Sequence, residues 1–421
     1  MQSSIKLRLT VMNFLQFAVW GAYLTSMGRY LGTAGFGSEI GNFYAMQGLV
    51  SLFMPALMGI VADRWIPAQR LLGLCHTLAG MLMLGVFLYT QTDTPSYPSL
   101  FALYSLSVAF YMPTLALSNS VAYSSLDQAG LDLVKSFPPI RVFGTVGFIC
   151  TMIAVSLLGL EATSGQFAVS AIISLVLAVY AQTLPNCPTA PKGQSKSLVE
   201  ALGLRAFVLF KQRKMALFFI FSMLLGVSLQ ITNGFANPFI STFGEIPAYA
   251  DTFGVKYANI LISLSQLSET LCILLIPFAL RRFGIRRVML IAMVAWVLRF
   301  ALLGLGNPGS GVWLFLLSMI VYGVAFDFFN VSGSLFVDKE TDPSIRSSAQ
   351  GLFMIMTNGI GATLGSLGAQ AVINRFVYSQ SEATAILSGW TTSWYIFAGY
   401  AAVVAVLFAL LFRYNTATEA K

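Results

Sequence analysis

Long apolar stretches separated by short polar segments run through almost the whole sequence. About twelve of them reach the roughly 20 residues that a helix needs to cross a hydrocarbon layer about 30 Å thick. The expected spans are residues 8–31, 40–62, 69–90, 98–122, 138–160, 165–185, 214–243, 256–281, 286–305, 311–337, 346–373 and 390–412. The pattern predicts an all-α membrane protein with twelve transmembrane helices.

The longest polar interruption falls between the sixth and seventh spans and divides the helices into two sets of six. We therefore expect an N-terminal six-helix bundle over 1–185, a cytoplasmic linker with an amphipathic segment over 186–213, and a C-terminal six-helix bundle over 214–421. The first apolar stretch continues to about Leu31, which is too long for the core of a secretory signal peptide. It is predicted to be an uncleaved first span.

Composition supports a membrane protein, and the distribution of basic residues predicts which loops face the cytoplasm. Hydrophobic residues make up 57% of the 421 residues and charged residues only 10%, whereas soluble domains carry about 25% charged residues. The net charge of +8 follows from Lys and Arg on one set of loops, which marks the cytoplasmic side. Few basic residues, among them Arg29, Lys256 and Arg375, fall on the opposite loops. Both termini are therefore expected in the cytoplasm, and nucleic acid is not an expected partner.

Metal or cofactor chemistry is not indicated. The four cysteines, Cys75, Cys150, Cys187 and Cys272, show no CxxC spacing, so neither a disulfide framework nor a zinc site is predicted. The single histidine, His76, lies in an apolar segment. We interpret it as a structural histidine rather than a metal ligand or a proton relay.

Polar residues inside the predicted spans recur at helical spacing. A carboxylate such as Glu269 costs roughly 2.5–3.5 kcal/mol at the centre of a membrane helix and usually marks an ion or substrate pathway. Residues three, four or seven positions apart share one helix face. Four spans carry such stripes: Arg141, Thr145 and Phe148; Gln230 and Asn233; Gln266 and Glu269; Tyr322 and Phe326, followed by Asp327. One stripe would fit hydrogen bonding between helices at about 0.6 kcal/mol, but four favour a shared cavity.

The side chains of this cavity indicate a neutral ligand. Amides donate and accept hydrogen bonds together, which suits a polyol or a heterocycle, and aromatic faces suit a planar ring. A site for an organic anion would gather several cations, whereas Arg141 is the only one in the stripes. The sequence has no GxxxxGK[ST] nucleotide-binding motif. Transport would therefore use an ion gradient or follow the concentration gradient of the substrate itself.

Two intramembrane carboxylates are candidates for carrying a proton. Asp327 has a residue of opposite charge, Arg299, on the adjacent span, and we expect the two to lie close enough to neutralise each other partly. Glu269 has no basic residue within a turn on its own helix. Glu269 is accordingly the first candidate for the coupled proton, and Asp327 is the second.

The loop after the second span resembles the loop signature of the major facilitator superfamily, G-x-x-x-D-R-x-G-R-R. Gly59, Asp63, Arg64 and Arg70 match it, and the corresponding loop of the second half, RRFGIRR at 281–287, matches only in its basic residues and Gly284. The resemblance implies two six-helix bundles around a central cavity. In this interpretation Asp63, Arg64 and Arg299 have structural or gating roles.

Several segments closely resemble the bacterial nucleoside:proton symporter family, a group of nucleoside permeases. They include FPPIRVFGTVGF at 137–148, SQLSETL at 265–271 and SMIVYGVAFDFFNVSGSLFV at 318–337. The resemblance implies proton-driven nucleoside uptake across the bacterial inner membrane by a monomeric carrier without a cofactor. It also implies substrate contacts from Arg141, Thr145, Phe148, Gln230, Asn233, Gln266, Glu269, Tyr322 and Phe326, the residues that the spacing selects independently.

Three alternatives remain at this point. A symporter of a sugar or another small neutral metabolite would use a similar cavity. A membrane-embedded enzyme would carry a motif such as HExxH or GxSxG, and the sequence has neither. A receptor-like relative would bind without transport. The preference between purine and pyrimidine nucleosides and the proton stoichiometry are left open.

Overall fold

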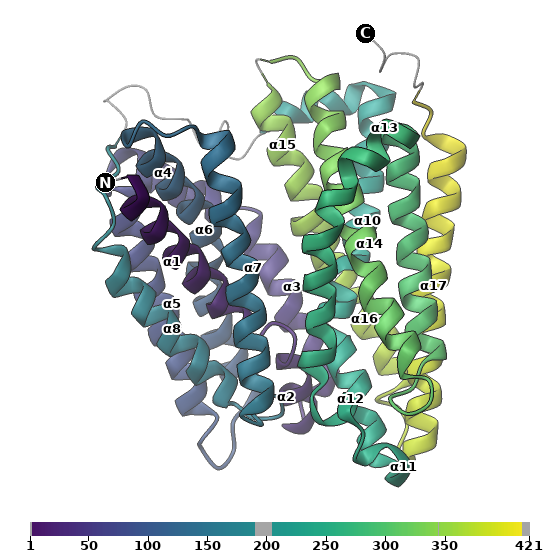
Figure 1. The fold of residues 1–421 in the computed structure, drawn as a ribbon. Helices are drawn as coiled ribbons and strands as arrows, with labels where there is room; N and C mark the ends of the chain where they lie inside the picture. Colours follow the sequence, from purple (N-terminus) through teal and green to yellow (C-terminus); the bar gives the residue numbers. More distant parts are fainter. Residues whose placement is uncertain (1, 190–203, 344, 415–421) are drawn as a thin grey trace. The chain divides into compact units, whose positions relative to one another are not determined.

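The structure is a computed structural model that describes residues 2–189, 204–343 and 345–414, in which helices are present and strands are absent (Figure 1). Most of the predicted linker, residues 190–203, and the C-terminal Lys421 lie outside these residues. The described chain forms two compact units. Unit 1 contains residues 2–30 and 49–189, and unit 2 contains residues 31–48, 204–343 and 345–414.

Unit 1 consists of long apolar helices joined by short turns. Its helices are α1 (Gln2–Gly21), the first part of α2 (Met27–Thr33), α4 (Met54–Arg64), α5 (Ala68–Tyr89), α6 (Tyr97–Gln128), α7 (Leu133–Leu157) and α8 (Gly165–Ala181).

Helices α1 and α7 of unit 1 approach each other closely at glycines. A Cβ at Gly147 would lie 2.1 Å from the Phe14 carbonyl oxygen, and one at Gly21 would lie 2.4 Å from the Phe148 carbonyl oxygen. Small residues at such crossings let helix backbones make van der Waals contact, which is a main source of helix association inside a membrane. The two glycines therefore fix the height at which α7 presents Phe148.

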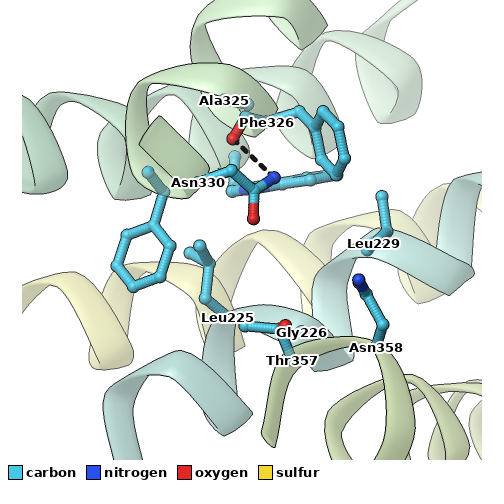
Figure 2. A pocket seen from close by; sticks show the side chains of 10 residues that line it. Leu225, Gly226, Leu229, Ala325, Phe326, Asn330, Thr357 and Asn358 are labelled. Atoms are coloured by element: carbon cyan, nitrogen blue, oxygen red, sulfur yellow. Dashed lines mark hydrogen bonds between the residues drawn. The ribbon is translucent and has the colours of Figure 1, made fainter. Parts of the chain in front are cut away.

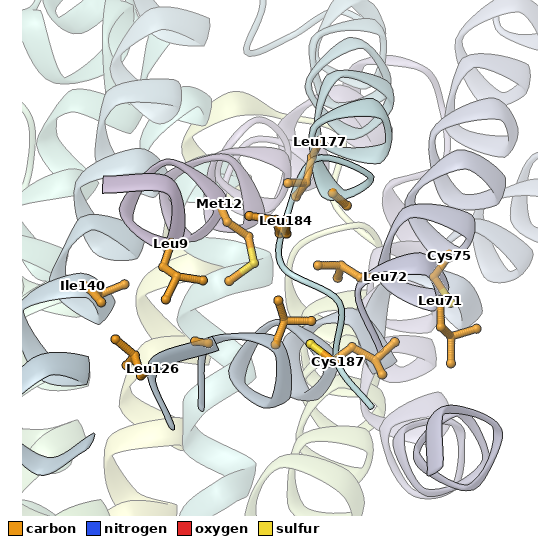
Figure 3. Packing of buried hydrophobic residues seen from close by; sticks show 14 residues of the cluster. Leu9, Met12, Leu71, Leu72, Cys75, Leu126, Ile140, Leu177, Leu184 and Cys187 are labelled. Carbon is orange, nitrogen blue, oxygen red and sulfur yellow. The ribbon is translucent and has the colours of Figure 1, made fainter. Parts of the chain in front are cut away.

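A buried apolar cluster joins five helices of unit 1 (Figure 3). It includes Leu9 and Met12 on α1, Leu71 on α5, Ile140 on α7 and Leu177 on α8, all at most 3% exposed. Many other large apolar side chains of the chain, such as Leu88 at 58% and Val179 at 72%, are exposed. In a membrane protein those side chains contact lipid, so their exposure carries no penalty.

Unit 2 contains the remaining helices. They are η1 (Gly37–Glu39), most of α3 (Ile40–Ser51), η2 (Leu204–Lys211), α10 (Arg213–Thr242), η3 (Phe243–Glu245), α11 (Pro247–Ala250), α12 (Phe253–Lys256), α13 (Ala258–Leu305), α14 (Val312–Glu340), α15 (Arg346–Met354), η4 (Ile355–Gly361), α16 (Ala362–Phe376) and α17 (Ala383–Leu411).

The 48-residue α13 contains two predicted spans. Its helical backbone is broken at Gly284, where φ is 76° and ψ is 163°. Only glycine adopts this combination at little cost, so the chain turns there and the second half returns alongside the first. The glycine of the basic RRFGIRR loop is thus the hinge between two spans.

The segment 31–48 packs within unit 2, although the sequence places it in the N-terminal bundle. The Gln370 side chain on α16 donates from Nε2 to the Gly37 carbonyl (3.0 Å), and Asn374 donates from Nδ2 to the Ser38 carbonyl (3.1 Å). A Cβ at Gly48 would lie 2.5 Å from Thr363 Oγ1. Hydrogen bonds to backbone groups and close glycine contacts hold this segment against α16.

Nine helices of the described chain are long and apolar enough to span a membrane, so the chain is a multi-pass membrane protein. One of the nine, α13, covers the two spans predicted at 256–281 and 286–305. The span predicted at 8–31 is divided between α1 and α2, and α8 is an apolar helix of only 17 residues. The number twelve stays a prediction.

Candidate functional site

The polar residues predicted on α10 are in contact with each other. Asn233 donates from Nδ2 to Gln230 Oε1 at 2.8 Å, and Gln230 is 7% exposed. The spacing of three residues places both amides on one face of the helix. The bond orients the Gln230 carboxamide and leaves its NH₂ group directed away from Asn233.

Two carboxyl groups of unit 2 lie within electrostatic reach of each other. Glu269 is on the first half of α13 and Asp327, which is 6% exposed, is on α14. Each charge acts on the other, and Tyr322 lies within reach of both. Asp327 Oδ2 is buried and has no hydrogen-bond partner among the described residues. These two carboxyl groups are the candidate proton-binding groups of unit 2.

The predicted pairing of Asp327 with Arg299 is wrong. The Arg299 guanidinium is buried and donates from Nη1 to the Ser318 carbonyl at 2.8 Å, and it covers the Tyr322 ring at 4.5 Å. Ser318 and Tyr322 precede Asp327 by nine and five residues, or about 13 and 7 Å along a helix. Arg299 thus meets α14 at least one turn before Asp327 and packs the two helices together.

The predicted aromatic pair on α14 forms a stack. The rings of Tyr322 and Phe326 are 5.7 Å apart and inclined by 4°, and Trp296 meets Tyr322 edge to face at 5.9 Å. With the Arg299 guanidinium on the Tyr322 ring, the Tyr322 side chain is held on several sides. The stack ends at the Phe326 ring, which is half-buried.

A pocket next to Phe326 adds residues that the sequence analysis does not select (Figure 2). Its walls come from α10, α13, α14 and η4. They are formed by Leu225, Gly226, Leu229, Trp296, Ala325, Phe326, Phe329, Asn330, Thr357 and Asn358. Asn330 lies four residues after Phe326, so extending the 322–326 stripe by one turn would have identified it. Asn358 lies in the π-helix η4, which the regular helical spacing of apolar and polar residues does not predict.

The predicted site residues of unit 1 lie on α7. The Arg141 guanidinium covers the Phe17 ring on α1 at 4.0 Å. Phe148 meets Trp20 edge to face at 6.4 Å, and Thr145 is half-buried between them along the helix. These three residues share one face, as their spacing predicts.

His76 belongs to a buried hydrogen-bond network of unit 1. Its Nε2 lies 2.8 Å from Gln16 Oε1 and its Nδ1 lies 2.9 Å from Ser174 Oγ. Both ring nitrogens therefore have partners, and the side chain joins α5 to α1 and α8. The sequence predicts this structural role for His76.

Asp63 and Arg64, the residues of the predicted loop signature, lie at the end of α4. Among the described residues, no group of three His, Cys, Asp or Glu side chains lies close enough together to bind a metal ion.

Comparison with known proteins gives consistent matches over almost the whole chain. The sequence model of the family described as "Nucleoside H+ symporter" matches residues 3–417. The xanthosine permease of Escherichia coli (strain K12) is 51% identical over 415 residues, 98% of this chain and 97% of that protein. The nucleoside permease NupG of the same organism is 47% identical over 98% of this chain and 97% of its own.

Solved structures agree with the sequence matches. A crystal structure of the nucleoside transporter NupG superposes with a TM-score of 0.89 at 46% identity, covering 98% of this chain and 100% of the other. A D-xylose–proton symporter superposes with a TM-score of 0.67 at 13% identity, over 97% of this chain and 98% of the other. The second match shows the shared fold alone.

Proposed function

The chain belongs to the nucleoside H⁺ symporter family, and we propose that it carries a nucleoside inward together with a proton by alternating access. The observation that carries the proposal is the arrangement in unit 2. A carboxyl pair, Glu269 and Asp327, lies beside the Tyr322–Phe326 stack. One part of this arrangement can take up a proton and the other can bind a planar, uncharged ring.

The substrate-binding part of the proposal is supported by residue chemistry. The Gln230 and Asn233 amides offer donors and acceptors to hydroxyl groups and ring nitrogens, and the Phe326 ring offers a stacking face. Gln266 and Glu269 lie three residues apart on α13, on the helix that also faces Tyr322. Arg141, Thr145 and Phe148 are proposed to contribute from unit 1, on the basis of their sequence positions.

The proton-binding part is supported by the surroundings of the carboxyl pair. Arg299 is engaged with Ser318 and Tyr322, so Asp327 lacks the counter-ion expected from the sequence. Asp327 therefore joins Glu269 as a proton-binding group instead of serving as half of an ion pair. We propose that the pair shares the coupled proton, with Glu269 also contacting the substrate.

The location of the protein is proposed from its loops. The excess of Lys and Arg on one set of loops supports cytoplasmic termini in a bacterial inner membrane, and a monomer is the simplest carrier. Uptake of labelled uridine and adenosine, compared with labelled hexoses, by cells that express the chain tests the substrate class. Accumulation of nucleosides alone supports the proposal, and accumulation of a hexose alone contradicts it.

We expect Gln230→Ala and Asn233→Ala each to weaken nucleoside binding by roughly 2–10-fold, because each removes one hydrogen bond to an uncharged ligand worth about 0.5–1.5 kcal/mol. Calorimetry on the purified protein measures the change. The two losses should not multiply in the double variant, since Asn233 donates to Gln230 and each single change already disturbs the other amide. Gln380→Ala, an exposed loop amide, is the control. Unchanged affinity in both single variants would remove these residues from the site.

A further inference from the structure

The pocket beside Phe326 continues the predicted site by one helical turn on two helices. On α10, Leu229 lines the pocket and lies four residues before Asn233. On α14, Asn330 lines it and lies four residues after Phe326. Residues four apart stand one above the other on a helix face. A ligand held by Asn233 and Phe326 would therefore have this pocket next to it.

Two carboxamides face this pocket and keep hydrogen-bonding capacity. Asn330 donates from Nδ2 to the Phe326 carbonyl at 3.1 Å, which uses one of its two N–H groups and fixes the side chain. Asn358 has only a long contact, 3.8 Å, from Nδ2 to the Met354 sulfur. Figure 2 shows the two side chains on opposite walls, Asn330 on α14 and Asn358 on η4. Each therefore presents a donor and an acceptor to whatever enters.

The rest of the wall is apolar and partly aromatic. Trp296, Phe326 and Phe329 provide rings, and Leu225 and Leu229 provide aliphatic surface. The space enclosed by these walls has room for about one water molecule, far less than the roughly 300–1,000 Å³ of pockets that enclose a whole ligand. The walls therefore offer a contact surface for the edge of a ligand bound next to them.

The backbone that carries Asn358 is unusual and firmly held. Residues Ile355–Gly361 form a π-helix, a conformation that is rare and often occurs at functional sites. It packs against α10 without side chains between the backbones, because a Cβ at Gly226 would lie 2.2 Å from the Thr357 carbonyl oxygen. The π-turn shifts the register of the residues that follow and turns Asn358 toward the pocket.

We propose that Asn330 and Asn358 bind the edge of the nucleobase and determine which base the carrier prefers. The inference rests on the proposed nucleoside transport and assigns the base, as distinct from the ribose, to this pocket. Base edges place hydrogen-bond donors and acceptors side by side, and a carboxamide matches such a pair. The Phe326 ring, which forms part of the wall, stacks on the face of the same base.

The test measures the affinity of each protein variant for each ligand analogue by calorimetry on the purified full-length protein, and compares the loss of affinity between ligands. The variants are Asn330→Ala and Asn358→Ala, with Gln380→Ala as the control. The ligands are adenosine, purine riboside, which lacks the exocyclic amino group, and 3′-deoxyadenosine. If the protein prefers pyrimidines, uridine, the 2-pyrimidinone riboside and 3′-deoxyuridine replace them.

We expect each variant to lose roughly 2–10-fold in affinity for the parent nucleoside. For the analogue without the exocyclic group, the loss of affinity should be smaller in at least one variant. For the 3′-deoxy analogue, the loss of affinity should be as large as for the parent nucleoside in both variants. A loss that disappears with the 3′-deoxy analogue would assign the amides to the ribose and overturn the inference. Unchanged affinity for all ligands would also overturn it.

Two controls keep the outcome interpretable. Asn330→Ser and Asn358→Ser keep a small polar side chain, and the unfolding temperature of every variant shows whether it is folded. If the wild-type protein binds nucleosides and the variants bind them equally well, only the base-binding inference is rejected. A wild-type protein that binds neither these ligands nor xanthosine, the substrate named for a relative 51% identical, rejects the proposed function itself.

Discussion

Glu269→Gln is expected to abolish proton-driven accumulation of nucleoside while preserving exchange of nucleoside across the membrane. The amide keeps the shape and the hydrogen-bonding capacity of the side chain but does not release a proton. One charge moving inward gains about 2.3 kcal/mol per 100 mV, which corresponds to roughly 50-fold accumulation of a neutral solute. In vesicles with an imposed proton gradient, the ratio of internal to external nucleoside should fall to about 1. Counterflow in the same vesicles should persist.

Asp327→Asn is the matched variant, because Asp327 is the second member of the carboxyl pair and has no salt bridge to Arg299. If the pair shares the proton, each single variant should change the dependence of uptake on external pH, and the double variant should show none. If both single variants and the double variant accumulate nucleoside with the wild-type pH dependence, the pair is not the coupling site.

Gly226→Ala should destabilise unit 2 and weaken nucleoside binding together. The added methyl group would lie 2.2 Å from the Thr357 carbonyl oxygen, so α10 and η4 must move apart. Overpacking of this kind costs about 1–3 kcal/mol, and backbone atoms yield less readily than the end of a flexible side chain. The movement displaces Asn358 and the pocket wall. The unfolding temperature and the dissociation constant measure the two effects.

Gly399→Ala is the control for this prediction. Gly399 is also inside a helix, α17, but a Cβ there meets nothing within 4 Å. Exchanging glycine for alanine in a helix gains about 0.5–1 kcal/mol when there is room, so stability should stay equal or rise slightly. Equal stability of Gly226→Ala and Gly399→Ala would show that the contact between α10 and η4 does not restrain the fold.

The sequence predicts the helical fold and much of the candidate site because both depend on local patterns. Apolar stretches identify most of the spans, and the intervals 230–233 and 322–326 correctly place side chains that contact each other in the structure. A stripe on one helix needs only the 3.6-residue period. Contacts of this kind are therefore accessible without knowledge of the fold.

The features that the sequence does not predict depend on how helices meet. Arg299 and Asp327 have opposite charges on adjacent spans, but the register between α13 and α14 brings Ser318 to Arg299 instead. Asn358 faces the pocket because of a π-turn, which changes the helical period within one segment. The segment 31–48 follows the first span in sequence yet is bound by Gln370 and Asn374 on α16. These arrangements require the tertiary structure.

The central claim, coupled movement of nucleoside and proton, is tested most directly in proteoliposomes that contain a pH-sensitive dye. With equal pH on both sides and an inside-negative potential, external nucleoside should acidify the lumen and should accumulate above its external concentration. A protonophore should abolish the accumulation. Entry of nucleoside without acidification, ending at equal concentrations on both sides, would contradict the account.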